Sequence, residues 1–385
     1  MLFSIIISRG WVRELGAVTH PLFALFVISF IAYIPGFMNA FLMASLLLDK
    51  RPERRSPAVY PAVTVLIDRG PAQEMGDQVT RAPAVTLAAA AAIAGASPAI
   101  AQEATGAPSR AAGADIFYSS DAEDTEVLKT GLNLDWRYRG PQDYQGIRVE
   151  TARFTPLGQD GKSFERAYLR LAGDNAGWNW NATVGTDGHT VLGSASIHNG
   201  KKFRQEYFIE REIVESPLGI SRGIYYTFAG ASIDLPADDR NNFNVFAGVQ
   251  EFTGDNVRLH LRGNYVHVVK PEWGLSAQLR ARYFRSSEPG EYDYYSPRWY
   301  AQLLPVLQVR RFTGGWQLLG AAGLGAQRDS ERGWRSSRYL NALVTSPAFR
   351  RDWAINANFL YSNTPVGTGF TYSYVQFNLG LTRAF

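Results

Sequence analysis

The chain of 385 residues contains no cysteine. This absence excludes disulfide bonds, thiol nucleophiles and thiolate metal ligands. Only five histidines are present, and no local spacing places one beside a serine with an orienting carboxylate, as a hydrolase triad needs. We therefore predict no catalytic residue, no metal site and no cofactor.

The chain as a whole is not strongly hydrophobic: its mean hydropathy is −0.17. A polytopic helical membrane protein would be far more apolar. Aromatic residues nevertheless make up 13% of the chain, which suits strands with one lipid-facing and one wet face. The formal charge of +4 does not indicate nucleic-acid binding, because the basic excess lies in the first part of the chain. It consists of Arg9, Arg13, Lys50, Arg51, Arg54, Arg55, Arg69 and Arg81.

Residues 370–385 alternate with a period of two and stop on Phe385. Such alternation gives an extended strand one apolar and one polar face. An apolar face toward lipid, a polar face toward a lumen and a final aromatic residue are typical of the last strand of a bacterial outer-membrane barrel. We interpret Phe385 as an insertion signal. The predicted outer face carries Val375, Phe377, Leu379, Leu381 and Phe385, and the inner face carries Tyr374, Gln376, Asn378, Gly380 and Thr382.

Consecutive β-strands are predicted throughout residues 124–385. Turn signals such as Asp187-Gly188 and Asn199-Gly200 separate fifteen alternating segments. A closed bacterial barrel has an even number of strands, so one segment is missed or split. The sequence therefore predicts an all-β fold, an antiparallel outer-membrane β-barrel of 16 strands, with 14 as the alternative. A β-sandwich is disfavoured, because its dry core would not accept so many arginines.

Charged residues define the predicted lumen, because a charge on the lipid face costs about 2–4 kcal/mol at the middle of the bilayer. Two interpretations stay open for these side chains. They form either a buried network that braces the wall or a wet track along which a hydrophilic polymer slides. The lumen-lining candidates are Arg258, His260, Arg262, Arg280, Arg282, Glu206, Glu210 and Glu212.

An aromatic run covers residues 291–300. It is either part of an interfacial girdle or a stacking platform at the mouth of a pore. The candidates are Tyr292, Tyr294, Tyr295, Trp299 and Tyr300.

The first 123 residues read as targeting segments and a linker. Residues 1–74 contain an uncharged apolar run over 21–48, long enough for a transmembrane helix, and a basic linker. Residues 75–101 have the polar start, apolar middle and A-x-A end of a signal peptide, with cleavage expected between Ala101 and Gln102. Residues 102–123 are predicted to be a linker. Two export signals suggest a fusion or a misassigned start, with a mature protein from about Gln102.

Residues 20–67 resemble the opening of processive family-2 glycosyltransferases, through the helix, the basic linker and the run Pro61-Ala-Val-Thr-Val-Leu-Ile67. The Asp-x-Asp and Gln-x-x-Arg-Trp motifs of that family do not follow, so the catalytic domain is absent from this chain.

The barrel resembles the porin domains that export poly-N-acetylglucosamine and cellulose, through Tyr294-Tyr-Ser-Pro297 and the strand that ends in phenylalanine. This resemblance implies passage of an exopolysaccharide, and partners among lipids, the barrel-insertion machinery, an inner-membrane synthase and a periplasmic repeat protein.

Three functions stay open. The first is an outer-membrane porin that passes an exopolysaccharide or another hydrophilic solute. The second is a barrel-embedded hydrolase that uses His260, and the third is a plugged structural or adhesive barrel. No nucleic acid is expected as a partner, and the bacterial outer membrane is the expected location.

Overall fold

The computed structural model describes residues 110–121, 125–156, 160–347, 353–364 and 373–385. The chain divides into two units, residues 1–67 and 68–385, and every described residue belongs to the second. The predicted transmembrane helix, the signal peptide with its cleavage site and the glycosyltransferase-like segment lie outside the described residues. They stay predictions.

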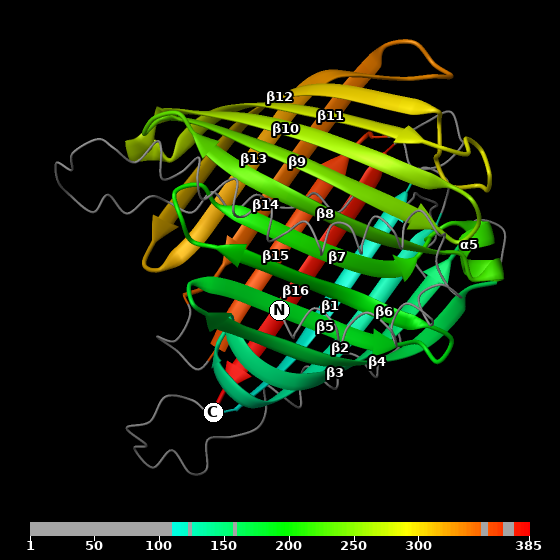
Figure 1. Ribbon diagram of the computed structural model, residues 1–385. Helices are drawn as coiled ribbons and strands as arrows, with labels where there is room; N and C mark the ends of the chain where they lie inside the picture. Colours follow the sequence, from blue (N-terminus) through cyan, green and yellow to red (C-terminus); the bar gives the residue numbers. More distant parts are fainter. Residues whose placement is uncertain (1–109, 122–124, 157–159, 348–352, 365–372) are drawn as a thin grey trace, which may run out of the picture. The chain divides into compact units, whose positions relative to one another are not determined.

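The described residues form sixteen strands in a closed barrel (Figure 1). Every neighbouring pair is antiparallel, and the strands follow one another around the barrel in chain order. The prediction of a 16-stranded antiparallel barrel is therefore confirmed. The strands are β1 (Ala111–Asp121), β2 (Glu126–Gly140), β3 (Asp143–Thr155), β4 (Lys162–Asn175), β5 (Trp178–Thr186), β6 (Val191–Asn199), β7 (Gln205–Ile213), β8 (Tyr225–Pro236), β9 (Asn241–Phe252), β10 (Val257–Lys270), β11 (Leu275–Ser286), β12 (Trp299–Thr313), β13 (Trp316–Asp329), β14 (Arg335–Thr345), β15 (Trp353–Ser362) and β16 (Tyr374–Ala384).

The barrel closes where β1 pairs with β16, from Ala111 opposite Ala384 to Asp121 opposite Tyr374. This corrects the sequence prediction, because β1 lies within the expected linker of residues 102–123. The alternation in β1 is weak, since small residues such as Ala112 and Gly113 occupy both faces. Pairing with β2 and β16, rather than local hydrophobicity, holds this segment in the sheet.

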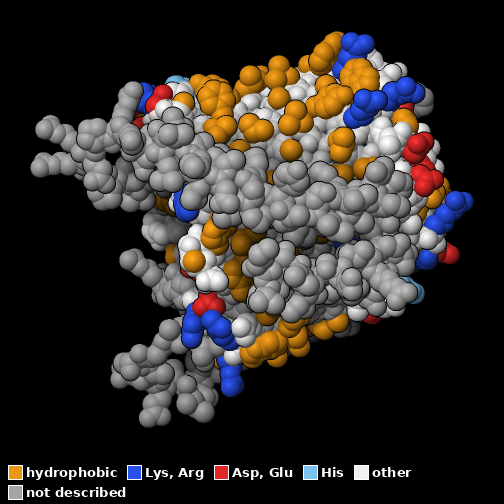
Figure 2. Space-filling model, in the orientation of Figure 1, with side chains coloured by type: hydrophobic (Ala, Val, Ile, Leu, Met, Phe, Trp, Pro, Cys, Tyr) orange, Lys and Arg blue, Asp and Glu red, His pale blue; other side chains and the backbone are white. Residues whose placement is uncertain are grey.

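The outer face of the barrel is apolar. Leu259 is 57% exposed and Leu261 52% exposed, whereas His260 between them is 5% exposed. Figure 2 shows hydrophobic side chains spread over the outer surface of the barrel. Exposing so much apolar surface to water would be unfavourable in free energy, whereas contact with lipid is not. The chain is therefore a bacterial outer-membrane barrel.

The two ends of the barrel differ. One end, which we call the terminal end, carries Arg110 and Phe385, whose backbone groups exchange hydrogen bonds of 3.1 and 2.9 Å. Exposed aromatic rings gather there, among them Trp136, Trp273 and Phe312, as in an interfacial girdle.

The opposite end, which we call the loop end, carries longer connections between strands. Its β7–β8 connection contains the short helix α5 (Pro217–Arg222), while the β10–β11 turn at the terminal end contains the 3-10 turn η1 (Pro271–Trp273). Gly274 closes that turn with φ of 64° and Gly223 ends α5 with φ of 70°, a backbone region that favours glycine. Neither helical segment of the described chain has the length and hydropathy to cross a bilayer.

Candidate functional site

The inner wall of the barrel is the working surface that the fold offers. Alternation sends side chains of one parity inward on each strand, opposite the exposed apolar residues. On β10 the inward set contains three predicted residues and on β11 two, with Arg262 directly opposite Arg282. The three glutamates on β7 share a face of the strand with Phe208. The exposed Ile209 is on the other face, so the glutamates point inward. The structure therefore places all eight lumen-lining candidates on inward faces: Arg258, His260, Arg262, Arg280, Arg282, Glu206, Glu210 and Glu212.

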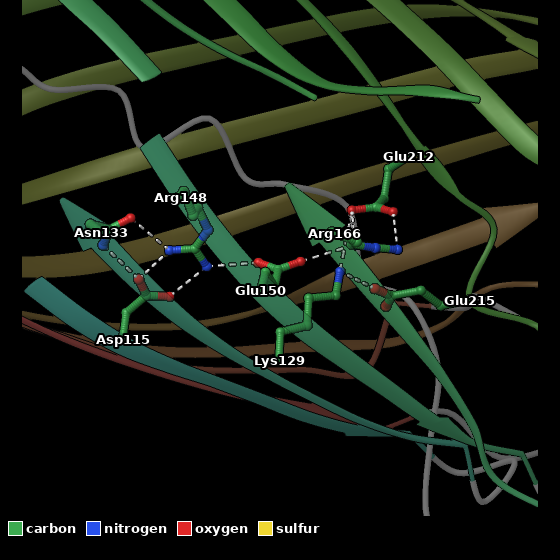
Figure 3. A network of polar contacts seen from close by, with 8 residues as sticks. All are labelled: Asp115, Lys129, Asn133, Arg148, Glu150, Arg166, Glu212 and Glu215. Atoms are coloured by element: carbon green, nitrogen blue, oxygen red, sulfur yellow. Dashed lines mark hydrogen bonds and ion pairs between the residues drawn. The ribbon is translucent and has the colours of Figure 1, made fainter. Parts of the chain in front are cut away.

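A polar network covers the inner wall from β1 to β4 (Figure 3). Arg148 on β3 bridges two carboxylates on either side of it. It pairs with Asp115 on β1, and its Nη2 donates to Glu150 Oε2 at 2.7 Å. Asn133 on β2 donates to the same Asp115 carboxylate at 3.1 Å. The arginine charge is therefore balanced by two carboxylates inside the sheet.

The network continues to β7 through Arg166 on β4. Its guanidinium donates to Glu150 Oε1 at 3.1 Å and to Glu212 Oε1 at 2.9 Å. Lys129 on β2 donates to Glu215 Oε1 at 2.7 Å and lies 3.4 Å from Glu212 Oε2. Cations and carboxylates alternate along this line (Figure 3). The arrangement matches the bracing interpretation of the charged wall.

Gly131 makes room for this network. It lies on the inward face of β2, and a Cβ atom there would be 2.3 Å from Arg148 Nη2. Arg148 lies flat over the glycine, which lets it reach Asp115 on one side and Glu150 on the other. A small residue on β2 thus allows a long side chain of β3 to follow the wall.

Removing the central arginine should destabilise the barrel. The Arg166 side chain is fully buried, and its loss leaves Glu150 and Glu212 without this partner. We expect Arg166→Ala to lower the free energy of unfolding by about 3–5 kcal/mol, because an unpaired buried charge is costly. Urea unfolding in lipid vesicles measures this. The control is Arg139→Ala, since Arg139 is 67% exposed and its pair should contribute at most about 1 kcal/mol. Equal midpoints for the two variants would contradict the bracing role.

A second cluster on β9 to β11 combines arginine with aromatic rings. The guanidinium of Arg258 lies 4.5 Å from the ring centre of Phe284 and 4.9 Å from that of Phe252. Its Nη2 donates to the backbone oxygen of Tyr295 at 2.5 Å. Cation–π contacts of this kind stabilise a buried cation without a carboxylate.

His260 lies between the two arginines of β10. Its Nε2 is 3.1 Å from Gln250 Oε1. Its ring is tilted against those of Phe228 and Phe284, with ring centres 4.8 and 5.6 Å away. Among the described residues no serine or threonine hydroxyl bonds to this histidine. The geometry shown for His260 therefore gives no support to a hydrolase triad.

The residues of the predicted aromatic run do not all face the same way: some pack against the inner wall, and one points outward. Tyr294 stacks on Phe252 at 4.3 Å and Tyr300 stacks on Phe284 at 5.0 Å, so both rings pack against inward-facing residues. Tyr292 and Tyr295 pack beside them, with ring centres 6.2 Å from Tyr294 and from Phe284 respectively. Trp299 has the outward parity of β12 and contacts Arg328.

Two connections meet at the loop end: residues 214–224 between β7 and β8, and residues 287–298 between β11 and β12. We call them the mouth segments. Asp293 of the second segment accepts hydrogen bonds from Ser216 Oγ at 2.6 Å and from the backbone nitrogen of Leu218 at 2.7 Å. It thereby assists Ser216, the N-cap of α5.

The first mouth segment folds over the inner wall. Ile220 of α5 is buried in one cluster with Val127 of β2, Phe154 of β3 and Tyr168 of β4, which all face inward. Lys162 Nζ on β4 donates to the backbone oxygen of Ile220 at 3.2 Å. The second mouth segment contacts β9 through Tyr294 and Phe252 and β10 through Tyr295 and Arg258. The two joined segments therefore link nearly opposite walls across the mouth.

Sequence reasoning missed the β1–β4 network and the contact between the mouth segments. Strand-by-strand face assignment would have found Arg148, because it lies between the apolar Ile147 and Val149. The signal is weaker for Lys129, which precedes Thr130, and for Arg166, which follows Glu165. No comparable signal marks Asp293, whose partners lie 75 and 77 residues away in the chain.

No family model matches the chain, and no curated protein matches its sequence. Solved structures match its fold. A bacterial polysaccharide outer membrane secretin matches with a TM-score of 0.53 at 15% identity, over 71% of this chain and 98% of that chain.

Two further matches are OccK5 (OpdH) of Pseudomonas aeruginosa and OccAB3 of Acinetobacter baumannii. OccK5 has a TM-score of 0.36 at 10% identity, over 71% of this chain and 97% of that chain. OccAB3 has a TM-score of 0.37 at 11% identity, over 72% and 99%. The closed barrel, the apolar outer belt and the polar inner wall give this chain the fold of a sixteen-stranded outer-membrane porin.

Proposed function

We propose that this barrel is a passive porin that passes an exopolysaccharide across the outer membrane. The observation that carries the proposal is the inner wall, which carries exposed neutral polar side chains as well as packed charge pairs. Asn181 on β5 is exposed and faces inward, and it donates to Ser196 on β6 at 2.8 Å. Such amides and hydroxyls suit the hydroxyl groups of sugars without holding any one unit tightly.

The fold supports the same proposal. The barrel is similar to a polysaccharide outer membrane secretin over nearly the whole of that chain. That protein differs in sequence at most positions, so the likeness supports a shared architecture and leaves the polymer to be identified. A synthase in the inner membrane and a periplasmic partner would supply the polymer.

The purified barrel should form steady channels. In planar bilayers we expect constant open-channel currents that are linear in voltage near zero, as for a water-filled pore. A plugged structural barrel would give no steady current. Deleting the gene should leave polymer inside the periplasm, and restoring the barrel should return polymer to the medium. Release of fatty acid or sugar by the purified barrel from lipids or oligosaccharides would instead favour the hydrolase.

A further inference from the structure

Two arginines and a tryptophan lie together on the lipid-facing side of the wall at the loop end. This outer patch, as we call it, consists of Arg285 on β11, Trp299 on β12 and Arg328 on β13. Each has the outward parity of its strand, which it shares with exposed hydrophobic residues such as Tyr283 and Leu324. Figure 2 shows Lys and Arg side chains at this edge of the hydrophobic surface, where β11 and β12 reach the loop end.

The three residues of the outer patch are neighbours across the sheet. Arg285 is directly opposite Trp299 in the register of β11 and β12. Arg328 is opposite Ala301, two residues further along β12, and its guanidinium lies 5.7 Å from the centre of the Trp299 ring. The tryptophan therefore has an arginine on each of the two neighbouring strands.

No described carboxylate balances the positive charge of the outer patch. Both arginines are exposed, and neither forms an ion pair with Glu288 or Glu331, the exposed carboxylates of the adjoining connections. Asp329 follows Arg328 in the chain, but it is buried on the other face and pairs with Arg335. The counter-charge must therefore come from outside the described chain.

The place of the outer patch along the strands decides what it can meet. Each of its residues is the first or the penultimate residue of its strand at the loop end. A charge that faces lipid is costly at the middle of the bilayer and nearly neutral at the interface, where tryptophan also concentrates. The outer patch therefore lies at the level of the lipid head groups. Longer connections face the cell exterior in bacterial barrels, so these head groups belong to the outer leaflet.

We infer that the outer patch binds a phosphate group of lipid A, the phosphorylated glycolipid of the outer leaflet. Guanidinium groups bind phosphate through paired charge-assisted hydrogen bonds, and basic clusters beside a membrane recognise anionic head groups. The exposed Leu303 and Leu307 on the same face of β12 supply an apolar surface for the acyl chains. This site is on the outside of the wall, so the inference does not depend on what passes through the lumen.

Binding is tested on the detergent-solubilised full-length barrel by native mass spectrometry, which counts the lipid molecules on each barrel. The probes are diphosphorylated lipid A and the same lipid after enzymatic removal of its phosphates. We expect the phosphorylated form to bind preferentially. In R285Q/R328Q its affinity should fall about ten-fold, because two exposed charge pairs are lost.

The matched control is R153Q/R311Q, which also removes two exposed arginines of outward parity. Arg153 is at the loop end of β3 and Arg311 at the terminal end of β12, so both lie outside the outer patch. The affinity of this variant for lipid A should equal that of the wild type. A third variant, R285K/R328K, keeps the charge without the paired geometry and should bind with intermediate affinity.

Migration on unheated gels checks that each variant is folded. Equal binding of the two lipids, full affinity in folded R285Q/R328Q or an equal loss in R153Q/R311Q would each overturn the inference. If R285Q/R328Q does not fold, wild-type affinity in R285K/R328K would contradict the site. Displacement of lipid A by inorganic phosphate at equal concentration would show a site for free phosphate and would also overturn it. Channel currents test the porin separately, so the two proposals can fail independently.

Discussion

Deleting residues 380–385 should prevent the barrel from entering the outer membrane. The deletion removes half of the seam between β16 and β1, where Gly380 to Ala384 pair with Asp115 to Ala111. The freed backbone groups would face lipid, and each unsatisfied group there costs several kcal/mol. We therefore expect almost all of the truncated protein in the periplasm or degraded. Fractionation and migration on unheated gels measure the membrane-inserted, folded fraction.

Two variants sharpen this experiment. Phe385→Ala keeps the whole seam and removes only the exposed ring, so a smaller loss separates the role of the aromatic residue from that of strand pairing. Lys201→Ala is the control, because Lys201 lies exposed in the β6–β7 connection at the same end and takes no part in the seam. Normal outer-membrane yield of the truncated protein would be incompatible with a barrel closed by β1 and β16.

The strands with strong alternation were predictable from sequence. On β10, charged and aromatic residues alternate with Leu259 and Leu261, so lipid on one side and water on the other fix the parity. The expected inward position of Arg258 and Arg262 follows from this rule alone. The count of sixteen also followed from sequence, because closure requires an even number of strands.

The first strand could not be found in the same way. Its inward face contains Ala111 and Gly113, its outward face contains Ala112 and Ala114, and neither face has a clear hydrophobic signature. What defines β1 is the row of backbone partners on β2 and β16, at separations that a local window does not cover. Closure of the sheet, a property of the whole chain, decides the structure of this segment.

The candidate site shows the same limit. Parity predicts which side chains face inward, but it does not predict which charges meet across several strands. Arg166 on β4 reaches Glu212 on β7, although β5 and β6 lie between them in the sheet. Local reading placed Glu212 on an inward face and left Arg166 unassigned. The pairing of Arg166 with Glu150 and Glu212 therefore needs the three-dimensional contacts.

Contacts between the mouth segments should limit the current through the channel. Asp293 joins the two segments, and the ion pair between Lys129 and Glu215 fastens the first of them to β2. Because these contacts cross the loop end, loosening them should widen the narrowest part of the lumen. We expect the double variant D293A/E215A to raise single-channel conductance by about two-fold and to make the open current noisier, since conductance follows the width of the narrowest part.

The control for this experiment is Asp238→Ala. Asp238 also accepts hydrogen bonds from two backbone nitrogens, those of Arg240 and Asn241, but it lies in the β8–β9 turn at the terminal end. Loss of its carboxylate removes a comparable set of bonds without touching the mouth segments, so its conductance should equal that of the wild type. If D293A/E215A is folded and conducts no better than Asp238→Ala, the mouth segments do not set the pore width. The narrowest part of the lumen would then lie deeper in the barrel.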